Sequence, residues 1–303
     1  MSDEKITLRE ARDRMTSGTV ILNVTFHQPG MTRPGDLSEV ETTADKAMLS
    51  LSKTLVRSRN YVNMGRASMY CHDELRQLRI PSSVLRRGSH KVAVDCLDRA
   101  VEIVKKYEAE FMEAAEKFAD EWPTLLETAK DRLQGQFKLA DYPTVEHVRN
   151  ASWVEYYLTE QNTPKESKLG ADLYNREKQK AENRAQREVV GCVQAMRVAL
   201  KEVLDKFATS LGTRSDGRKR AVTDKGYAAA VEFLELFKNR NVLGDSDAQL
   251  LADQALRILD GAEPETLRTD DQFRSDVRRQ TEELTKSLDQ FIEDGPSRMF
   301  DFS

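Results

Sequence analysis

The residues best suited by type and spacing to do chemistry lie in one basic, glycine-containing segment. Gly212 and Gly217, followed by Arg218 and Lys219, have the glycine spacing of a phosphate-binding Walker A loop. The segment lacks the lysine directly followed by serine or threonine that contacts phosphate and Mg²⁺, and it follows a predicted helix instead of a strand. The sequence therefore argues against nucleotide hydrolysis here.

The same segment could instead contact the phosphates of a nucleic acid. The candidate cations, which include a second pair further upstream, are Arg86, Arg87, Arg214, Arg218, Lys219, Arg220 and Lys225. Binding of single strands usually also needs aromatic side chains on which bases stack, and only Tyr227 is close in sequence. The alternative is a solvated loop between helices, and the residues leave both interpretations open.

Metal and nucleophile motifs are missing from the sequence. Cys71-His72 and the pair His90 and Cys96 lack the CxxC or HxxxH spacing that directs two ligands to one side. Cys96 is flanked by Val94 and Leu97, which is typical of a small core residue. No GxSxG motif occurs, and the many carboxylates fit solvated helix faces. We therefore expect no catalytic residue, no metal, no cofactor and no enzymatic activity.

Aromatic residues and histidines form a second group of candidates. Trp153, Tyr156 and Tyr157 fall in a predicted strand, where they either pack against helices or offer a ligand platform. His27 and His147 lie near the predicted strands and are expected at a sheet edge or on the surface. The C-terminal run 299–303 (Met-Phe-Asp-Phe-Ser) is either a packed terminus or a docking peptide.

Two segments predict strands. Residues 19–27 alternate two sets of side chains, namely Val20, Leu22, Val24 and Phe26 against Ile21, Asn23 and Thr25, and residues 153–159 also alternate. Because an unpaired strand leaves backbone groups unsatisfied, we expect the two to pair with each other or with one more short strand.

The elements that must position these residues are mostly helices. A 3–4 apolar repeat predicts a long helix from Leu97 to about Gln136, with a kink or break at Trp122-Pro123, and another predicts a helix over 170–211. We expect these two to form a long antiparallel hairpin. A turn and short helix are predicted over 141–150, and further helices over 38–55, 61–79, 227–240, 246–259 and 269–292. Residues 162–168 are predicted to form a polar loop.

Composition limits the class of protein. Low glycine and proline counts, 14 and 8 in 303 residues, disfavour an all-β sandwich, and a net charge of −4 disfavours a globally basic nucleic-acid binder. Neither an apolar run of spanning length nor a signal peptide is present, so no membrane association is expected. Three cysteines do not make a disulfide framework, which favours the cytoplasm.

The predicted fold is mainly α with a small β-sheet (α+β), a long antiparallel helical hairpin and a helical bundle. The predicted division is 1–94 for the first strand and helices, 95–212 for the hairpin with the second strand, and 213–303 for the C-terminal bundle. One continuous domain is the alternative. Residues 55–91 carry eight Lys and Arg and two acids, whereas 95–131 carry five and eleven. We expect these adjacent segments to neutralise each other or to dock on a partner.

Three stretches resemble a bacterial and phage protein family of unknown function. They are Phe118–Leu133, Leu139–Val148 with its Tyr142-Pro143 turn, and Val154–Tyr157; Phe233–Val242 fits the same pattern. The family has no established catalytic residues. Its genes often lie beside a MoxR-type AAA+ ATPase and a von Willebrand A-type protein, which implies an adaptor role with that ATPase as partner. In phage genomes the resemblance equally implies a role in DNA metabolism or assembly.

The sequence therefore favours a non-enzymatic helical scaffold that forms homo-oligomers or docks on a protein partner. Long amphipathic helices of heptad character are typical of such proteins. The alternative is a protein that binds single-stranded or non-specific nucleic acid through the cations named above.

Overall fold

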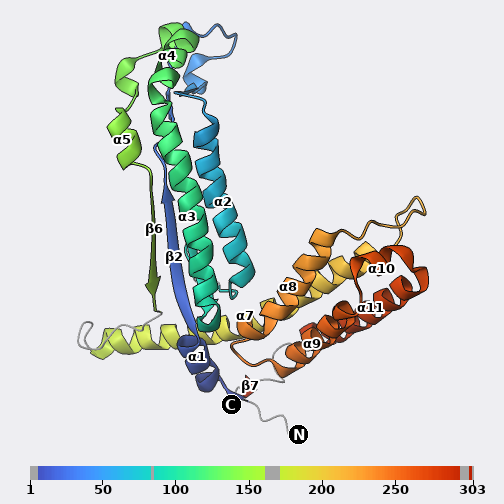
Figure 1. Ribbon diagram of the computed structural model, residues 1–303. Coiled ribbons are helices and arrows are strands. Elements are labelled where there is room, and N and C mark those ends of the chain that lie inside the picture. The colour runs from blue at the N-terminus through green and yellow to red at the C-terminus, as the bar shows by residue number, and fades with distance from the viewer. Residues whose placement is uncertain (1–5, 83–84, 161–170, 294–299, 302–303) are drawn as a thin grey trace. The chain divides into compact units, whose positions relative to one another are not determined.

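The computed structural model describes residues 6–82, 85–160, 171–293 and 300–301 (Figure 1). It is mainly helical with a three-stranded sheet, so the predicted class, mainly α with a small sheet, is confirmed. The chain folds into two compact units. Unit 1 comprises Met1–Leu22, Gln77–Asp98 and Leu158–Ser303, and unit 2 comprises Asn23–Arg76 and Arg99–Tyr157.

The units interleave along the chain, whereas the sequence suggested three consecutive segments. Each boundary between the units falls inside a regular element, namely β2 (Thr19–His27), α2 (Arg59–Leu78), α3 (Leu97–Asp120) and β6 (Trp153–Thr159). Because no glycine- or proline-rich linker marks these boundaries, composition along the chain could not indicate them.

Unit 2 contains the larger part of each of these four elements, and several short elements besides. They are β3 (Thr32–Pro34), β4 (Ser52–Thr54), α4 (Trp122–Leu133), α5 (Val145–Asn150) and the 3-10 turns Leu37–Glu39, Lys46–Met48, Gln134–Gln136 and Leu139–Asp141. The expected break at Trp122-Pro123 is confirmed: α3 ends at Asp120, and Pro123 stands in the first turn of α4. Trp122 is buried, with its ring edge-on to Phe118 at 5.6 Å between centroids.

The helix predicted over 38–55 is wrong. Residues 41–50 are all exposed, so the central part of the predicted apolar stripe finds no core to bury it, although Leu55 at its end is buried. Asp36 and Asp45 instead accept bonds from the backbone N–H groups of Ser38 and Ala47, each at 2.9 Å, and close two 3-10 turns. Such local side-chain bonds compete with helix formation. The segment then continues into β4, which pairs antiparallel with β3.

Unit 1 contains the remaining elements. They are β1 (Ile6–Thr7), α1 (Leu8–Ser17), β5 (Ser89–Ala93) with the 3-10 turn Val94–Cys96, α7 (Ala171–Leu211), α8 (Asp224–Arg240), α9 (Ser246–Asp260), α10 (Pro264–Thr269), α11 (Asp271–Glu293) and β7 (Phe300–Asp301). The sequence missed α1, α10 and the short strands. Of the C-terminal run, residues 300–301 pair parallel with β1, and Met299, Phe302 and Ser303 lie outside the described residues. So does the predicted loop 162–168.

The long helix α7 packs along α11 within unit 1. The sequence paired it with the helix ending near Gln136, which belongs to unit 2. The buried apolar stripe of α7 includes Val193, Leu200, Leu204 and Leu211. Such a stripe predicts that another amphipathic helix covers it but does not specify which one. None of residues 175–187 is buried, in agreement with their polarity. Among the described residues, every helix is too short or too polar to span a bilayer.

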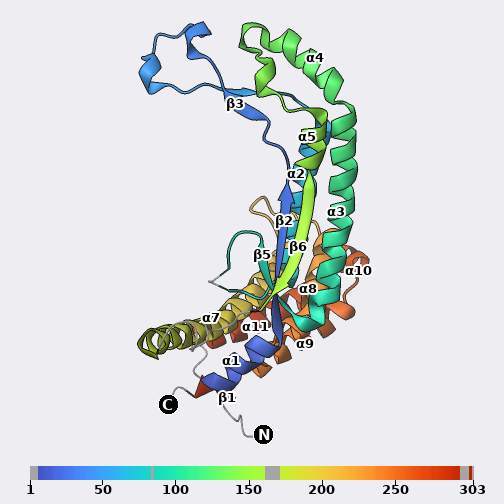
Figure 2. The same cartoon turned by 90° about the vertical axis from the view of Figure 1, so that its left-hand side faces the viewer.

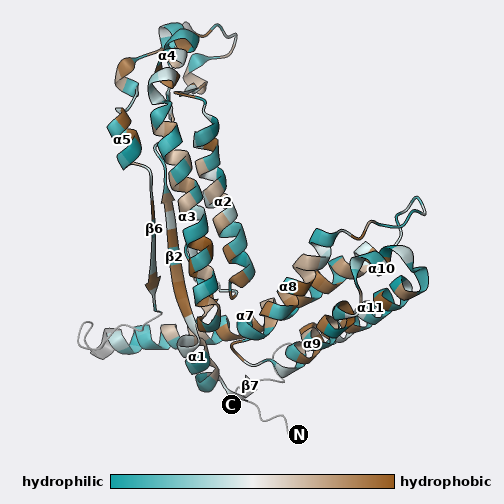
Figure 3. Cartoon of the chain, in the orientation of Figure 1, coloured by the Kyte–Doolittle hydropathy of each residue, from teal (hydrophilic) through white to brown (hydrophobic). Residues whose placement is uncertain are grey.

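The three-stranded sheet has the order β5-β2-β6. The expectation that the two predicted strands pair with each other is confirmed, and the alternative partner, one more short strand, is also present as β5. Figure 3 shows β2, the central strand, as a largely apolar ribbon. Both of its neighbours are strands, which leaves β6 at one edge.

Candidate functional site

Strand β6 exposes aromatic side chains at the edge of the sheet. Its alternation places Trp153, Glu155 and Tyr157 on the exposed face, while Val154 and Tyr156 are half-buried on the other. Trp153 and Tyr157 are 38% and 52% exposed. The sequence predicted the strand and its aromatic group, and the exposure of the odd-numbered positions favours a platform over packing for two of the three aromatics.

The opposite face of the sheet is packed. Phe26 of β2 meets Phe111 of α3 edge-on at 5.4 Å between ring centroids, and His72 of α2 lies 6.0 Å from the same ring. Val24 is buried beside it. In Figure 2, α3 runs along one side of β2 and β6. The helices of unit 2 therefore hold the strands from one face and fix the direction of the exposed side chains.

His27 holds Trp153 in place on the exposed face. The two rings stack in parallel, 5.0 Å apart between centroids with 6° between their planes. Nδ1 of His27 lies 2.6 Å from the carbonyl oxygen of Ala151. A carbonyl only accepts, so Nδ1 carries the proton and the ring orientation is set. His147, the other predicted histidine, is exposed on α5, where its backbone N–H is capped by Thr144.

An edge strand also offers its backbone. Every second residue of β6 directs its N–H and C=O away from β2, and no other described strand pairs with them. Natural edges are usually protected by charges, prolines or bulges, and β6 has one charge, Glu155, and no proline. The strand can therefore accept another extended segment.

The predicted cations are not brought together. Arg86 and Arg87 lie in a tight turn that leads into β5, and both are exposed. The strand after this turn, β5, contacts α7 through the ion pair between Lys91 and Glu188. The basic loop begins at the C-terminal end of α7, about 35 Å from Glu188 at a rise of 1.5 Å per residue. All the remaining predicted cations are exposed in that loop or just after it: Arg214, Arg218, Lys219, Arg220 and Lys225.

The basic loop is an ordered hairpin. The backbone N–H of Arg214 donates to Arg218 at 2.7 Å, and Gly217 takes φ +78°, which glycine adopts without strain. Lys219 forms an ion pair with Asp271. Arg274, buried in α11, donates to the carbonyls of Leu211 at 2.8 Å and of Arg220 at 2.7 Å and so ties down both ends of the loop. This construction fits the solvated-loop interpretation.

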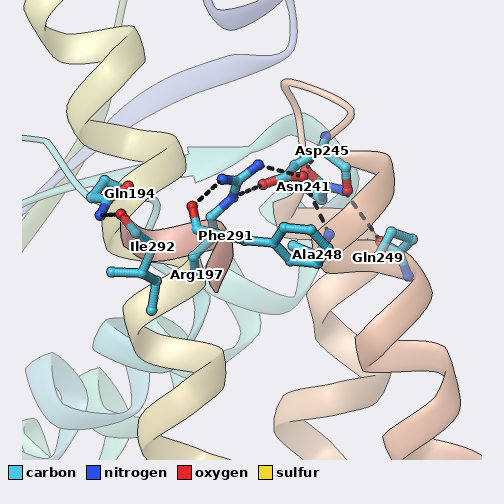
Figure 4. A network of polar contacts seen from close by, with 8 residues as sticks. All are labelled: Gln194, Arg197, Asn241, Asp245, Ala248, Gln249, Phe291 and Ile292. Atoms are coloured by element: carbon cyan, nitrogen blue, oxygen red, sulfur yellow. Dashed lines mark hydrogen bonds and ion pairs between the residues drawn. The ribbon is translucent and has the colours of Figure 1, made fainter. Parts of the chain in front are cut away.

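The most deeply buried ion pairs connect segments of unit 1. Arg197 of α7 makes a bidentate pair with Asp245, at 2.6 and 3.2 Å, and also donates to the carbonyl of Phe291 (Figure 4). Asp245 in turn caps α9 by accepting from Ala248. Lys91 and Glu188, both 3% exposed at their side chains, form a second pair at 2.9 Å. These groups bond to one another and to helix ends, which assigns them a structural role.

Thiol and metal chemistry find little support in the described part of the chain. Cys71, Cys96 and Cys192 form no disulfide and are buried, in agreement with the core role predicted for Cys96. Burial raises the pKa of Cys71 and of Cys192 to about 12, so both stay protonated at neutral pH. Among the described residues, no three His, Cys, Asp or Glu side chains converge as metal ligands.

Comparison of the chain with protein-family models, with curated proteins and with solved structures found no match.

Proposed function

We propose that the chain is a non-enzymatic interaction protein that associates with a second copy of itself through β6. The observation that carries the proposal is an edge strand that exposes Trp153, Tyr157 and Leu158. Large apolar side chains beside unpaired backbone groups are the two features that strand addition uses, for affinity and for specificity.

The sequence of β6 is complementary to itself in one register. Two edges pair antiparallel only when opposing residues both direct their backbone outward, so one residue of β6 must face its own copy. Centring on Tyr156 pairs all seven residues, with Val154 opposite Leu158 and Glu155 opposite Tyr157. Centring on Glu155 sets two like charges face to face, which is destabilising. Centring on Tyr157 leaves Trp153 without a partner in the strand.

The Tyr156 register makes one six-stranded sheet with a two-fold axis through its centre. Such an isologous contact closes after two copies and does not propagate into a fibre. In this register Trp153 faces the β-branched Thr159 and Tyr156 faces its own copy, and each such cross-strand pair contributes about 0.2–1 kcal/mol beyond the backbone bonds. The symmetric pairing therefore uses every residue that β6 exposes.

Light scattering over a range of protein concentrations tests the proposal. The chain is expected to run as a dimer at high concentration, and Tyr157→Glu is expected to run as a monomer, because it places a carboxylate opposite Glu155 at two points of the interface. Tyr157 is about half exposed, so the substitution leaves the unit's core intact. A wild-type chain that stays monomeric at every concentration would contradict the proposal.

Nucleic-acid binding stays the alternative, supported only by the exposed cations of the basic loop. A gel shift that weakens steeply with salt and disappears on charge reversal of Arg218, Lys219 and Arg220 would support it. The AAA+ ATPase partner implied by the family resemblance likewise stays an expectation.

A further inference from the structure

Unit 2 contains a cleft between β4 and α4 that neither the edge strand nor the predicted cations involve. Its volume is about 520 Å³, within the range of about 300–1,000 Å³ typical of small-molecule sites. It is lined on one side by residues 52 and 54–57, and on the other by residues 125, 128, 129, 132 and 133. The second set lies on one face of α4, since its members recur every three or four residues.

The floor of the cleft is apolar and the rim is basic. Leu55, Val56 and Ala129 are buried in it, at 1%, 6% and 5% exposure. Arg57 and Arg132 are exposed at the rim. Within the described part of the chain, neither guanidinium has an ion pair or hydrogen bond, and no carboxylate lines the cleft. An anion entering the cleft would therefore meet two cations that no internal acid neutralises.

Hydroxyl groups add acceptors and donors at the same rim. Ser52 and Thr54 are exposed on one side of β4, and Thr128 faces them from α4. The Thr128 hydroxyl donates to the carbonyl of Thr124 at 2.9 Å, so its orientation is already set.

The walls are held rigidly from behind. Lys53, which points to the opposite side of β4, pairs with Asp141 at 2.6 Å and donates to the carbonyl of Gln136 at 2.6 Å. The hydroxyl of Tyr142 donates to the carbonyl of Leu55 at 3.1 Å. A site formed in advance loses little conformational entropy when it binds a ligand.

We infer that this cleft binds a small amphipathic anion, a phosphate or carboxylate carried on an apolar body such as an alkyl chain. The two arginines would hold the head group, for which their forked donors are suited, and the leucine-lined floor would cover the chain. The inference does not rest on the association of β6.

Calorimetric titration with four probes tests the inference on the full chain. Octyl phosphate and octanoate, the two sources of an anionic head group, distinguish phosphate from carboxylate recognition. At least one of them is expected to bind with a Kd of about 1 mM or tighter, the range expected for a ligand of this size. Octanol and inorganic phosphate, each lacking one half of the ligand, are expected to bind at least about tenfold more weakly.

Variants on either side of the cleft complete the test. Arg57→Gln and Arg132→Gln are each expected to weaken the tighter anion about tenfold, the loss expected for a charge-assisted bond. Thr128→Trp, at an exposed rim position, should block entry. Lys130→Gln, on the same helix but outside the cleft, is the matched control and should bind as the wild type does. Any of three results would overturn the inference. They are octanol binding as tightly as octyl phosphate, a variant that combines Arg57→Gln and Arg132→Gln binding the anion as tightly as the wild type, and no saturable binding of either anion.

Discussion

The two units differ in their arginines: among the described residues, the buried arginines lie in unit 1, whereas the one charged side chain that unit 2 buries is Lys53. Unit 1 buries Arg197, which pairs with the carboxylate of Asp245, and Arg274, which donates to backbone carbonyls such as that of Leu211 at the end of α7. Unit 2 leaves Arg57 and Arg132 exposed beside a cleft, and leaves the aromatic side chains of β6 on its surface. A buried charge is costly unless it is paired, so such groups identify contacts that the fold requires. The buried pairs therefore indicate a framework role in unit 1, and the two proposals place their binding residues mainly in unit 2.

The largest expected effect lies in unit 1. Asp245→Ala leaves the Arg197 guanidinium buried at 1% exposure and removes the cap of α9. Breaking a buried pair in this way costs about 3–5 kcal/mol. Urea unfolding followed by circular dichroism measures the loss.

The matched control is Asp205→Ala, which breaks the pair with Lys201 at 2.6 Å on the surface of α7, the helix that carries Arg197. Its side chain is 48% exposed, and exposed pairs contribute about 0–1 kcal/mol. Similar losses for the two variants would contradict the framework role of Asp245.

The next effect compares the units at alkaline pH. Burial raises the pKa of Cys71 in unit 2 and of Cys192 in unit 1 to about 12, from an ordinary value near 9. Above pH 9 the unfolded chain releases these protons while the folded chain keeps them, so stability falls as pH rises from 9 towards 12. At one pH unit above the ordinary value each thiol costs about 1 kcal/mol.

Urea unfolding of the wild type, Cys71→Ala and Cys192→Ala at pH 8 and pH 10 checks this slope. Each variant should lose less stability between the two pH values than the wild type does, whatever its stability at pH 8. Identical slopes in all three proteins would show that the thiols do not set the alkaline limit.

Some features could be read from the chain because the local pattern determines them. The alternation of residues 19–27 and the Trp122-Pro123 step predicted β2 and the break between α3 and α4, and the structure confirms both. Other features depend on tertiary contacts. β5 shows no alternation because four of its five residues, including Lys91, are buried, and without β5 the edge position of β6 could not be predicted.

The cleft could not be predicted from the sequence either. Arg57 and Arg132 are far apart in the chain, and only the packing of β4 against α4 brings them to one rim. The helix predicted over 38–55 obscured the site, because it placed Leu55 on a helical stripe instead of beside a strand. The predicted cations Arg86 and Arg87 and those of the basic loop share a charge but not a location.

The smallest effect concerns a strained turn that follows α4. Gln134 adopts φ +44°, a conformation that costs a residue with a side chain about 1–3 kcal/mol and that glycine accepts. Gln134→Gly is expected to raise the free energy of unfolding by about 0.5–1 kcal/mol, after the added entropy of the unfolded chain. Gln134→Ala removes the side-chain amide but keeps the strained backbone, so it is the matched control. If Gln134→Ala stabilises the protein as much as Gln134→Gly does, strain is excluded as the cause.

The central claim, that two copies pair through β6 in the Tyr156 register, is tested most directly by a charge swap at positions 155 and 157, which this register sets opposite each other. Sedimentation equilibrium of the wild type, Tyr157→Glu, Tyr157→Lys and the double variant Glu155→Lys with Tyr157→Glu measures the dimer Kd of each. The register predicts that Tyr157→Glu dimerises at least about tenfold more weakly than Tyr157→Lys, since two like-charge pairs replace two opposite-charge pairs. It also predicts that the double variant recovers the affinity of Tyr157→Lys. Equal Kd values for Tyr157→Glu and Tyr157→Lys, or a double variant as weak as Tyr157→Glu, would contradict the account.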